Sequence, residues 1–486
     1  MHTLDAFLAY LVASKHKRNA DLKALCLFLS SDKNYLCALM SNFLSANYLK
    51  NYKATFILAY PVILSQLGHI MVGVVDTAMV GQIGTVEQAA VALSNSLYTL
   101  VLVFGLGVSY GITPLVAAAD SSSNYSENAA LLKHGIIINT LLGILLFVLL
   151  FAISPVLNLF DQKQAVVDQA IPFLNVMMLG MIPLCIFSGF KQFTEGLSFT
   201  GIAMLITVGA NLLNILLNYL MIFGHWGFPE MGLMGSCWAS FISRVAMALV
   251  MFAYVYYNKE FKKYWLGFNF RNISKELTKK ILGIGVPSGL QWFFEVGAFA
   301  FAVIMIGWIS PDAQAAHQIA LSLAATTYMM ASGLSAAASV RVGNQLGLKS
   351  REGIRTAGFS AFLMVLIFMG TMALSFILLQ NYLPTLFSKE HNVIAISSSL
   401  LVIAAFFQLS DGIQVVGLGA LRGVKDVKIP TIITLVAYWM IGLPMSYILG
   451  FKLHLGVEGI WYGLSLGLTI SAILLFWRFN YVSKRI

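Results

Sequence analysis

The chain has 486 residues, of which 59% are hydrophobic and 10% are charged, and its formal net charge is +10. Because charged residues make up about a quarter of a soluble globular domain, this composition excludes that class and indicates a protein that crosses a membrane many times. The four cysteines (Cys26, Cys37, Cys185 and Cys237) are scattered and form no Cys-x-x-Cys pair. Neither a disulfide framework nor a metal site built on cysteine is therefore expected.

The first 50 residues differ from the rest of the chain. Residues 24–44 are apolar but are interrupted by Asp32 and Lys33, and the basic cluster KHKR precedes them at 15–18. A signal peptide is one interpretation, but this stretch has no cleavage motif of the Ala-x-Ala kind. We expect an N-terminal extension at 1–50 that is either amphipathic or the product of an upstream start codon, with the natural start at Met40. In neither case does it add a spanning helix.

Twelve apolar segments follow, each long enough to supply the roughly 20 residues that a helix needs to span a bilayer. They are residues 55–81, 90–119, 132–154, 169–190, 202–224, 233–257, 281–309, 317–346, 355–380, 395–421, 430–451 and 457–480. Several contain a proline, which membrane helices tolerate at bends and near helix ends: Pro61, Pro114, Pro172, Pro183, Pro287 and Pro444. The pattern predicts an all-α polytopic membrane protein of twelve transmembrane helices, some of which bend.

Lysines and arginines are concentrated in alternate connections between these segments. The connection at 258–281 alone carries seven, whereas the opposite set of connections carries only Lys163, Lys389 and Lys452. Because positively charged loops stay on the cytoplasmic side, we expect both termini to face the cytoplasm from a plasma (inner) membrane. Anionic lipid headgroups then account for the net positive charge, and no nucleic-acid partner is expected.

The second half of the chain repeats the first. AYPVILSQLGHIMVGVVDTAMVGQIG at 59–84 aligns with GVPSGLQWFFEVGAFAFAVIMIGWIS at 285–310, and MGLMG at 231–235 aligns with LGVEG at 455–459. Such internal repeats are typical of transporters with a binding site between the repeats. We expect a six-helix N-lobe at 51–257, a basic cytoplasmic linker at 258–280 and a six-helix C-lobe at 281–486. The two lobes are pseudo-symmetric and enclose a central cavity.

Two carboxylates lie deep within segments of the second half. Counted from the ends that lack lysine and arginine, Glu295 lies about 13 residues deep and Asp411 about 16, or roughly 20–24 Å at 1.5 Å per residue. Charges at such depth are costly and usually face a cavity or a partner. Two acids in one apolar cavity can hold a proton or a cation between them. Hydrogen bonding between neighbouring helices is the alternative interpretation.

A second set of polar residues lies in the first half. Asn214 and Asn218 are one helical turn apart on one face, and Asp76, Asn218 and Ser240 lie at matching depth in three segments. Their carboxylate, amide and hydroxyl oxygens suit Na⁺ or a proton relay better than a soft metal. We expect a coupling site here, with Asp76, Asn214 and Asn218 as the ligands if the ion is Na⁺. Polar packing between helices is the alternative.

Three further polar residues have more than one interpretation, and a fourth marks a difference between the halves. Arg244 lies eleven residues from the outer end of its segment, and it either pairs with an acid of the cavity or reaches towards the headgroups. Gln192 and Glu195 either line an inner entrance or form a solvated helix end. His69 occupies the position that aligns with Glu295, so the two halves differ in chemistry where they agree in pattern.

The sequence does not indicate an enzyme, because it contains neither HExxH nor GxSxG. The glycine-rich stretch GLGVSYG at 105–111 lacks the GxGxxG spacing of a phosphate-binding loop, and glycine in an apolar helix more simply allows close packing. A channel is disfavoured because the buried acids form no ring of filter residues. We expect no cofactor other than a transported coupling ion, Na⁺ or H⁺.

Four motifs resemble those of the multidrug and toxic compound extrusion (MATE) transporters, NorM-like branch. They are VDTAMVG at 75–81, LLNILLNYLMIFGHWGFPEMGLMG at 212–235, FFEVG at 293–297 and FFQLSDGIQVVGLGALRGVKD at 406–426. The resemblance covers residues 50–480 and implies twelve helices in two lobes around a cleft. It also implies the export of cationic amphipathic drugs or toxins in exchange for Na⁺ or H⁺, and hence a part in antibiotic resistance.

The resemblance also implies roles for particular residues. The family's acidic positions in the second lobe fall on Glu295 and Asp411. Those of the first lobe fall on Asp76, Asn214, Asn218 and Ser240, where relatives often have threonine. Nearby aromatic residues either stack on planar cations or serve as core and lipid contacts: Trp292, Phe293, Phe294, Phe406 and Phe407. We expect a monomer. The alternative function is a flippase for lipid-linked oligosaccharides of the same broader superfamily, for which several basic cavity residues would be expected.

Overall fold

The computed structural model describes residues 46–159, 164–265 and 273–486. The chain divides into two units, Met1–Ala54 and Thr55–Ile486. The first is described only at residues 46–54, where helix α4 (Ala46–Gly81) begins. The predicted extension therefore lies almost wholly outside the described residues, and both interpretations of it stay predictions.

Every regular element in these described ranges is a helix, and twelve are long and apolar enough to cross a membrane. The all-helical polytopic fold predicted from the sequence is thereby confirmed. Most spans are longer than the apolar segments that predicted them; the segment 132–154, for example, lies in a span at Tyr125–Asn158. The apolar run marks only the part of a helix that lies in hydrocarbon, whereas the helix continues into polar residues at either end.

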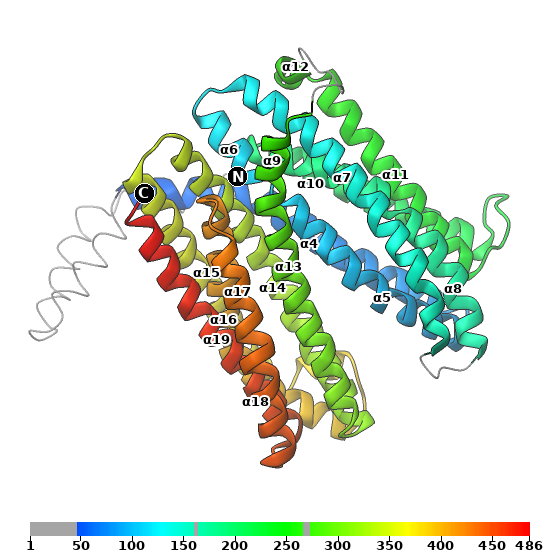
Figure 1. Cartoon of the computed structure of the whole chain (residues 1–486). Helices are drawn as coiled ribbons and strands as arrows, with labels where there is room; N and C mark the ends of the chain where they lie inside the picture. Colours follow the sequence, from blue (N-terminus) through cyan, green and yellow to red (C-terminus); the bar gives the residue numbers. More distant parts are fainter. Residues whose placement is uncertain (1–45, 160–163, 266–272) are drawn as a thin grey trace, which may run out of the picture. The chain divides into compact units, whose positions relative to one another are not determined.

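The helices of the first half pack as one group, drawn in blue to green in Figure 1. In this group α7 packs on α9, α10 on α11, and α5 on α8. Besides α4, its elements are α5 (Thr85–Ser109), α6 (Thr113–Ser121), α7 (Tyr125–Ile153), the 3₁₀ turn η2 (Ser154–Leu159), α8 (Gln164–Leu179), α9 (Met181–Gly196), α10 (Thr200–Phe223), α11 (Leu233–Tyr257) and the short α12 (Lys259–Trp265).

The helices of the second half pack as another group, drawn in green to red. Here α16 lies at the centre and contacts α14, α15 and α19. The elements are α13 (Lys275–Gly307), α14 (Pro311–Gly347), α15 (Arg351–Leu379), the 3₁₀ turn η3 (Leu383–Leu386), α16 (His391–Gly423), α17 (Lys428–Leu435), the π-helical η4 (Val436–Gly442), α18 (Leu443–Tyr447), the π-helical η5 (Ile448–Lys452) and α19 (Gly456–Ser483).

Matched glycines make the same contacts in the two halves. A Cβ on Gly235 would lie 2.6 Å from the backbone of Met221, and one on the aligned Gly459 would lie 2.6 Å from the backbone of Leu449. In both places the start of the last helix of the half packs directly on the preceding helix. The repeat in the sequence thus corresponds to a repeat in packing.

The prolines act in two ways. Pro114 lies in the first turn of α6, where a missing backbone N–H costs nothing. Pro444 lies in α18, which follows the π-helical η4 directly, inside the continuous span Lys428–Lys452. Pro61, Pro172 and Pro287 lie inside their helices. One of these prolines therefore lies at the start of a helix and the others lie inside one. The spacing of prolines in the sequence does not distinguish these two kinds of position.

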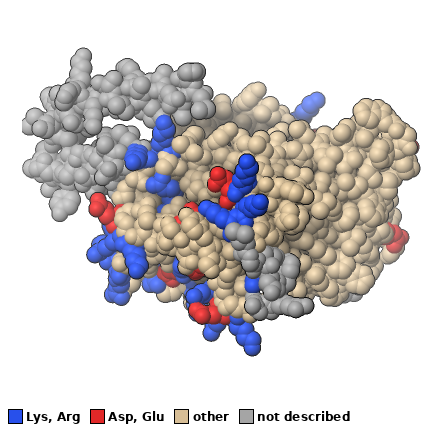
Figure 2. Space-filling model, turned by 90° about the horizontal axis from the view of Figure 1, so that it is seen from above, with Lys and Arg blue, Asp and Glu red and all other residues tan. Residues whose placement is uncertain are grey.

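One end of the bundle carries most of the basic side chains. Figure 2 looks onto this basic end, which we define by the connections that hold Lys259, Lys349, Lys425 and Lys484. Arg478 donates to Asp426 at 2.7 Å, so part of this charge is neutralised within the protein. The predicted separation of charge between the two ends is present, and its assignment to the cytoplasm stays a prediction.

The two groups of helices are in close contact near the basic end. A Cβ on Gly107 of α5 would lie only 2.5 Å from Cα of Gly289 in α13, and one on Gly347 of α14 would lie 2.2 Å from the carbonyl oxygen of Ala118 in α6. No side chain fits at such distances. The stretch 105–111 therefore serves close packing, as predicted, and it does so between the two groups.

Helix α4 contacts both groups. Near its start, Leu58 and Ala59 belong to the same buried cluster as Leu334 of α14, and Gln66 donates to Ser332 of that helix at 3.2 Å. Further along, its Asp76 bonds to α10. One helix of the first half thus spans the boundary between the two groups.

Candidate functional site

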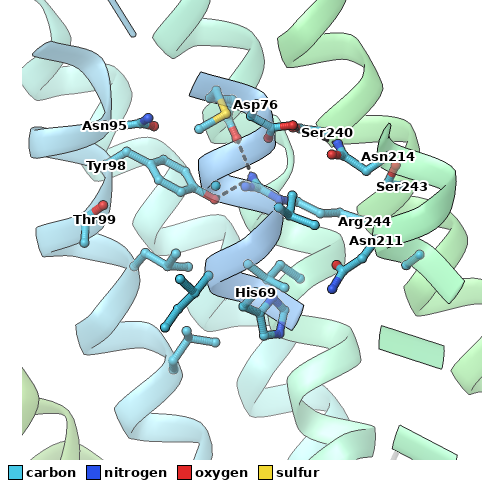
Figure 3. A pocket seen from close by; sticks show the side chains of 18 of the residues that line it. His69, Asp76, Asn95, Tyr98, Thr99, Asn211, Asn214, Ser240, Ser243 and Arg244 are labelled. Carbon is cyan, nitrogen blue, oxygen red and sulfur yellow. Dashed lines mark hydrogen bonds between the residues drawn. The ribbon is translucent and has the colours of Figure 1, made fainter. Parts of the chain in front are cut away.

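A cavity of about 600 Å³ lies among the helices of the first group. Its wall comes from α4, α5, α8, α9, α10 and α11, whereas the second group adds Trp292 and Met329. Figure 3 shows the polar side chains that point into it, from His69 and Asp76 on α4 to Arg244 on α11. The rest of the wall is mainly aliphatic and aromatic. A cavity that combines apolar surface with many polar side chains suits an amphipathic small molecule.

Four residues predicted from the first half meet at this cavity: Asp76, Asn214 and Ser240 line it, and Asn218 is buried beside them. Asn218 Nδ2 donates to Asp76 Oδ1 and, at 3.1 Å, to Asn214 Oδ1. Asn214 Nδ2 in turn donates to Ser240 Oγ at 3.2 Å. Three helices, α4, α10 and α11, thus place one carboxylate, two amides and one hydroxyl in a continuous chain. We call these four residues the oxygen cluster.

Ser240 contacts the oxygen cluster at two points. Its hydroxyl accepts from Asn214 Nδ2 and also hydrogen-bonds to Asp76, the residue to which Asn218 donates. These contacts agree with the matching depth predicted for Asp76, Asn218 and Ser240. The four residues are brought together, and their role in coupling stays a prediction.

The donor set of the oxygen cluster carries little charge. Asn218 Oδ1 is buried and accepts no hydrogen bond from the described residues, and a buried acceptor of this kind costs free energy unless it finds a partner. Within the described ranges, no three residues among His, Cys, Asp and Glu lie together as metal ligands. One carboxylate with neutral oxygens suits a monovalent cation or a proton rather than a transition metal.

Arg244 reaches into the same cavity and holds a neutral partner. Its Nη1 donates to the hydroxyl of Tyr98 at 2.6 Å and to the carbonyl of Met177 at 3.4 Å. Of the two interpretations made from the sequence, contact with headgroups is wrong, because the guanidinium lies within the cavity wall. It forms no salt bridge with a carboxylate of the described residues, but it lies close enough to the cavity acid Asp76 for their charges to interact.

The inner edge of the cavity is lined by residues of α9. Gln192 accepts a hydrogen bond from the hydroxyl of Thr113 at 2.6 Å and faces the cavity. Glu195 is 2% exposed and lies 3.8 Å from the ammonium of Lys191. The interpretation of a solvated helix end is therefore wrong for this stretch, because α6 covers it.

The structure places Glu295 and Asp411 away from this cavity. They are 5% and 4% exposed, lie inside the second group, and do not line the cavity. The hydroxyl of Tyr328 hydrogen-bonds to Glu295, and Asp411 lies close enough to Glu295 for their charges to interact. The predicted proximity of the two acids is observed. Neither acid lines the cavity of the first group in this conformation, and their predicted place in a substrate cavity stays a prediction.

Of the five aromatic residues predicted near the acids, one lines the cavity and the others do not. Trp292 lines the cavity and packs on Tyr110 with ring centres 5.5 Å apart. Phe406 is 66% exposed on the outside of its helix, whereas Phe407 is buried against Phe299. Stacking on a substrate is therefore open to Trp292, and lipid or core contact describes the others.

Sequence reasoning missed Tyr98 and Tyr328. Each is a single hydroxyl in an apolar helix, and its partner lies 146 residues away for Tyr98. Neither spacing nor local pattern connects residues so far apart. The depth of polar residues within the segments predicted the oxygen cluster. The same reasoning would have predicted these two residues only if tyrosines had been counted as polar.

The model of the MatE family matches residues 61–220 and 287–448, one match in each half of the chain. The multidrug resistance protein MdtK of Yersinia pseudotuberculosis is 33% identical over 443 residues, which cover 90% of this chain and 97% of that protein. MdtK of Yersinia enterocolitica is 32% identical over the same lengths.

Solved structures give the same result for the fold. The crystal structure of the eukaryotic MATE transporter AtDTX14 superposes with a TM-score of 0.81 at 21% identity, over 90% of this chain and 98% of that one. An outward-facing multidrug resistance transporter of the MATE family superposes with a TM-score of 0.80 at 20% identity, over 90% and 96%. The two family matches, the relatives above 30% identity and the shared fold agree with one another: the chain belongs to the MatE family.

Proposed function

We propose that this protein exports amphipathic small molecules, cationic drugs and toxins among them, in exchange for Na⁺ or H⁺. The observation that carries the proposal is the oxygen cluster, which places a carboxylate in the wall of a cavity of about 600 Å³. The name of the relatives, multidrug resistance protein, supports the class of substrate.

Competition for one charge provides the coupling. Asp76 lines the cavity while Asn218 donates to its carboxylate, so the same group faces both the cavity and the remaining oxygens of the cluster. A proton or Na⁺ bound there neutralises the carboxylate and weakens its attraction for a cationic substrate. By linkage, the substrate weakens the binding of the ion to the same extent.

Alternating access requires that only one end of the cavity be open at a time. In this conformation the close contacts at Gly107 and Gly347 join the two groups near the basic end. Tyr110 and Trp292 pack on each other between the cavity and that end, and the guanidinium of Arg422 lies 4.8 Å from the ring of Tyr110. We assign this conformation to the outward-facing state, with the basic end in the cytoplasm.

The acid pair of the second group is a second place for a coupling proton. Glu295 Oε2 is buried without a hydrogen-bond partner among the described residues, while Tyr328 bonds to the same side chain. Neither acid forms a salt bridge with a basic side chain of the described residues, and two such buried carboxylates are costly when both are charged. A proton that enters from one side and leaves to the other relieves this cost in each cycle.

Dye efflux from proteoliposomes tests the proposal directly. A Na⁺ gradient alone and a pH gradient alone are imposed in turn, and export of ethidium is followed with the wild type, Asp76→Asn and Thr77→Ala. Thr77 lines the same cavity, and its hydroxyl bonds only to its own helix at Gly73, so it is the matched control. We expect one gradient to drive export and Asp76→Asn to lose it. Export under neither gradient would refute the proposal.

The flippase alternative has less support. Of the several basic residues that a pyrophosphate would require, the cavity offers Arg244 and Lys191, and Lys191 lies near Glu195. The relatives above 30% identity carry names of drug resistance. Complementation of a cell-envelope defect, without any change in dye resistance, is the result that would favour the flippase.

A further inference from the structure

We propose that Arg244 binds the carboxylate of zwitterionic substrates, so that the cavity selects amphipathic molecules that carry an anionic group beside their cationic one. This inference rests on the proposed function and adds a second charge to the substrate that the cavity recognises. Its basis is the environment of Arg244.

The guanidinium of Arg244 has unused donors. Its Nη1 makes the two hydrogen bonds with Tyr98 and Met177, and no bond of Nε or Nη2 to a described residue is seen. A guanidinium carries five N–H donors in a fork that fits the two oxygens of a carboxylate. Arg244 thus offers one edge of the fork to the protein and keeps donors for a ligand.

The position of the guanidinium is fixed by its surroundings. Tyr98 is buried, its hydroxyl accepts from Nη1, and its ring lies 5.2 Å from the guanidinium carbon. A Cβ on Gly180 would lie 2.8 Å from Nη1 and 3.0 Å from Cδ of Arg244, so the gap between α8 and α9 is shaped around this side chain. A guanidinium held in this way loses little freedom when it binds an anion.

No carboxylate of the described residues forms a salt bridge with Arg244. Asp76, the carboxylate of the same cavity, lies close enough for its charge to interact with the guanidinium, but its own hydrogen bonds go to Asn218 and Ser240. A charged side chain at membrane depth is costly, and Asp76 offsets this cost only without direct contact. A substrate carboxylate that bonds to the free donors of the guanidinium lowers the cost further.

The spacing of charges on the wall fits a zwitterion. Ser240 and Arg244 lie four residues apart on α11, one above the other, so Arg244 lies about 6 Å along the helix axis from the oxygen cluster. One wall therefore presents a carboxylate at Asp76 and, about one turn closer to the basic end, a cation. A purely cationic molecule uses only the first of these groups.

Competition on the wild-type protein tests the inference without any variant. Export of ethidium from proteoliposomes is inhibited with norfloxacin, which has a carboxylate and an amine, and with its ethyl ester, which keeps the amine. Because a charge-assisted hydrogen bond contributes about 1.5–3 kcal/mol, we expect the acid to inhibit at least about tenfold more strongly than the ester. Equal inhibition by the two compounds overturns the inference.

Variants then connect the difference to Arg244. In Arg244→Gln the ratio of inhibition by the acid to inhibition by the ester is expected to fall to about one, and Arg244→Lys is expected to keep part of the preference. Ser243→Ala is the matched control, because Ser243 lines the same wall and its hydroxyl already bonds to Ala239. A preference that survives in Arg244→Gln, or an equal loss of acid inhibition and ethidium export, overturns the inference.

The two proposals fail in different ways. If the wild type exports no ethidium under either gradient, the proposed function is refuted. If it exports ethidium but does not distinguish the acid from the ester, the proposed function stands and the role of Arg244 is refuted.

Discussion

Gly107 offers the sharpest test of how the two groups of helices meet. In Gly107→Ala the new methyl carbon would lie 2.5 Å from Cα of Gly289 and 3.0 Å from its backbone nitrogen. An ordinary contact of this kind is about 3.4 Å or longer, so α5 and α13 must separate by roughly 1 Å. Overpacking of this size costs typically about 1–3 kcal/mol.

That cost falls on the closed basic end and not on a state in which the two groups separate there. A bias of about 1–3 kcal/mol changes the ratio of two conformations by roughly 5- to 150-fold. We therefore expect Gly107→Ala to populate a conformation that is open at the basic end and to slow export. Gly209→Ala is the matched control, because a Cβ on Gly209 meets nothing within 4 Å.

Accessibility of a single cysteine measures the effect. Ala336 lines a small pocket with Tyr110, Trp292 and Arg422, behind the packed basic end. In an otherwise cysteine-free protein with Ala336→Cys, a membrane-impermeant maleimide is added to inside-out vesicles. Labelling at least about fivefold faster in Gly107→Ala than in Gly209→Ala is expected. Equal labelling rates in the two variants would show that the helices absorb the methyl group without opening, and the reasoning would fail.

Three further changes have expected outcomes. Asn218→Leu removes the donor to the Asp76 carboxylate, so we expect the concentration of coupling ion that gives half-maximal export to change at least about threefold, measured in proteoliposomes. Glu295→Gln is expected to abolish ΔpH-driven export if H⁺ is the coupling ion, whereas Tyr328→Phe, which removes the bond to that acid, is expected to lower export without abolishing it. Gly235→Val places a side chain against the backbone of Met221, and we expect a melting temperature several degrees lower in detergent, because overpacking destabilises by about 1–3 kcal/mol.

The sequence predicted the number of helices and their pairing into repeats because both depend on one strong signal. Apolar runs of about 20 residues have few alternatives to a spanning helix, and matched glycines such as Gly235 and Gly459 fix the same contact in each half. The oxygen cluster was also within reach, since Asp76, Asn214, Asn218 and Ser240 are polar residues in apolar helices at related depth. Each of these inferences needed only distance along a helix.

Inferences that needed the direction of a side chain were less successful. Glu295 and Asp411 lie near each other, as depth predicted, yet they face the interior of the second group and not the cavity. Depth says how far into the membrane a residue lies, but the face of the helix on which it lies depends on rotation about the axis, which the neighbouring helices set. The contact of α4 with α14 through Gln66 and Ser332 could not be predicted from the sequence either, because no repeat encodes it.

His69 and Glu295 show why a shared backbone pattern does not imply shared chemistry. They occupy aligned positions of the two repeats, but His69 lines the cavity whereas Glu295 is buried beside Tyr328. If the second group used its acids as the first group uses Asp76, the cavity would carry three carboxylates and would attract cations of any kind. With Glu295 and Asp411 turned inward, Asp76 is the carboxylate among the described residues of the wall, and Arg244 stands near it as the opposite charge. The asymmetry between the halves thus gives the cavity both signs of charge, and it is this property that norfloxacin and its ester probe.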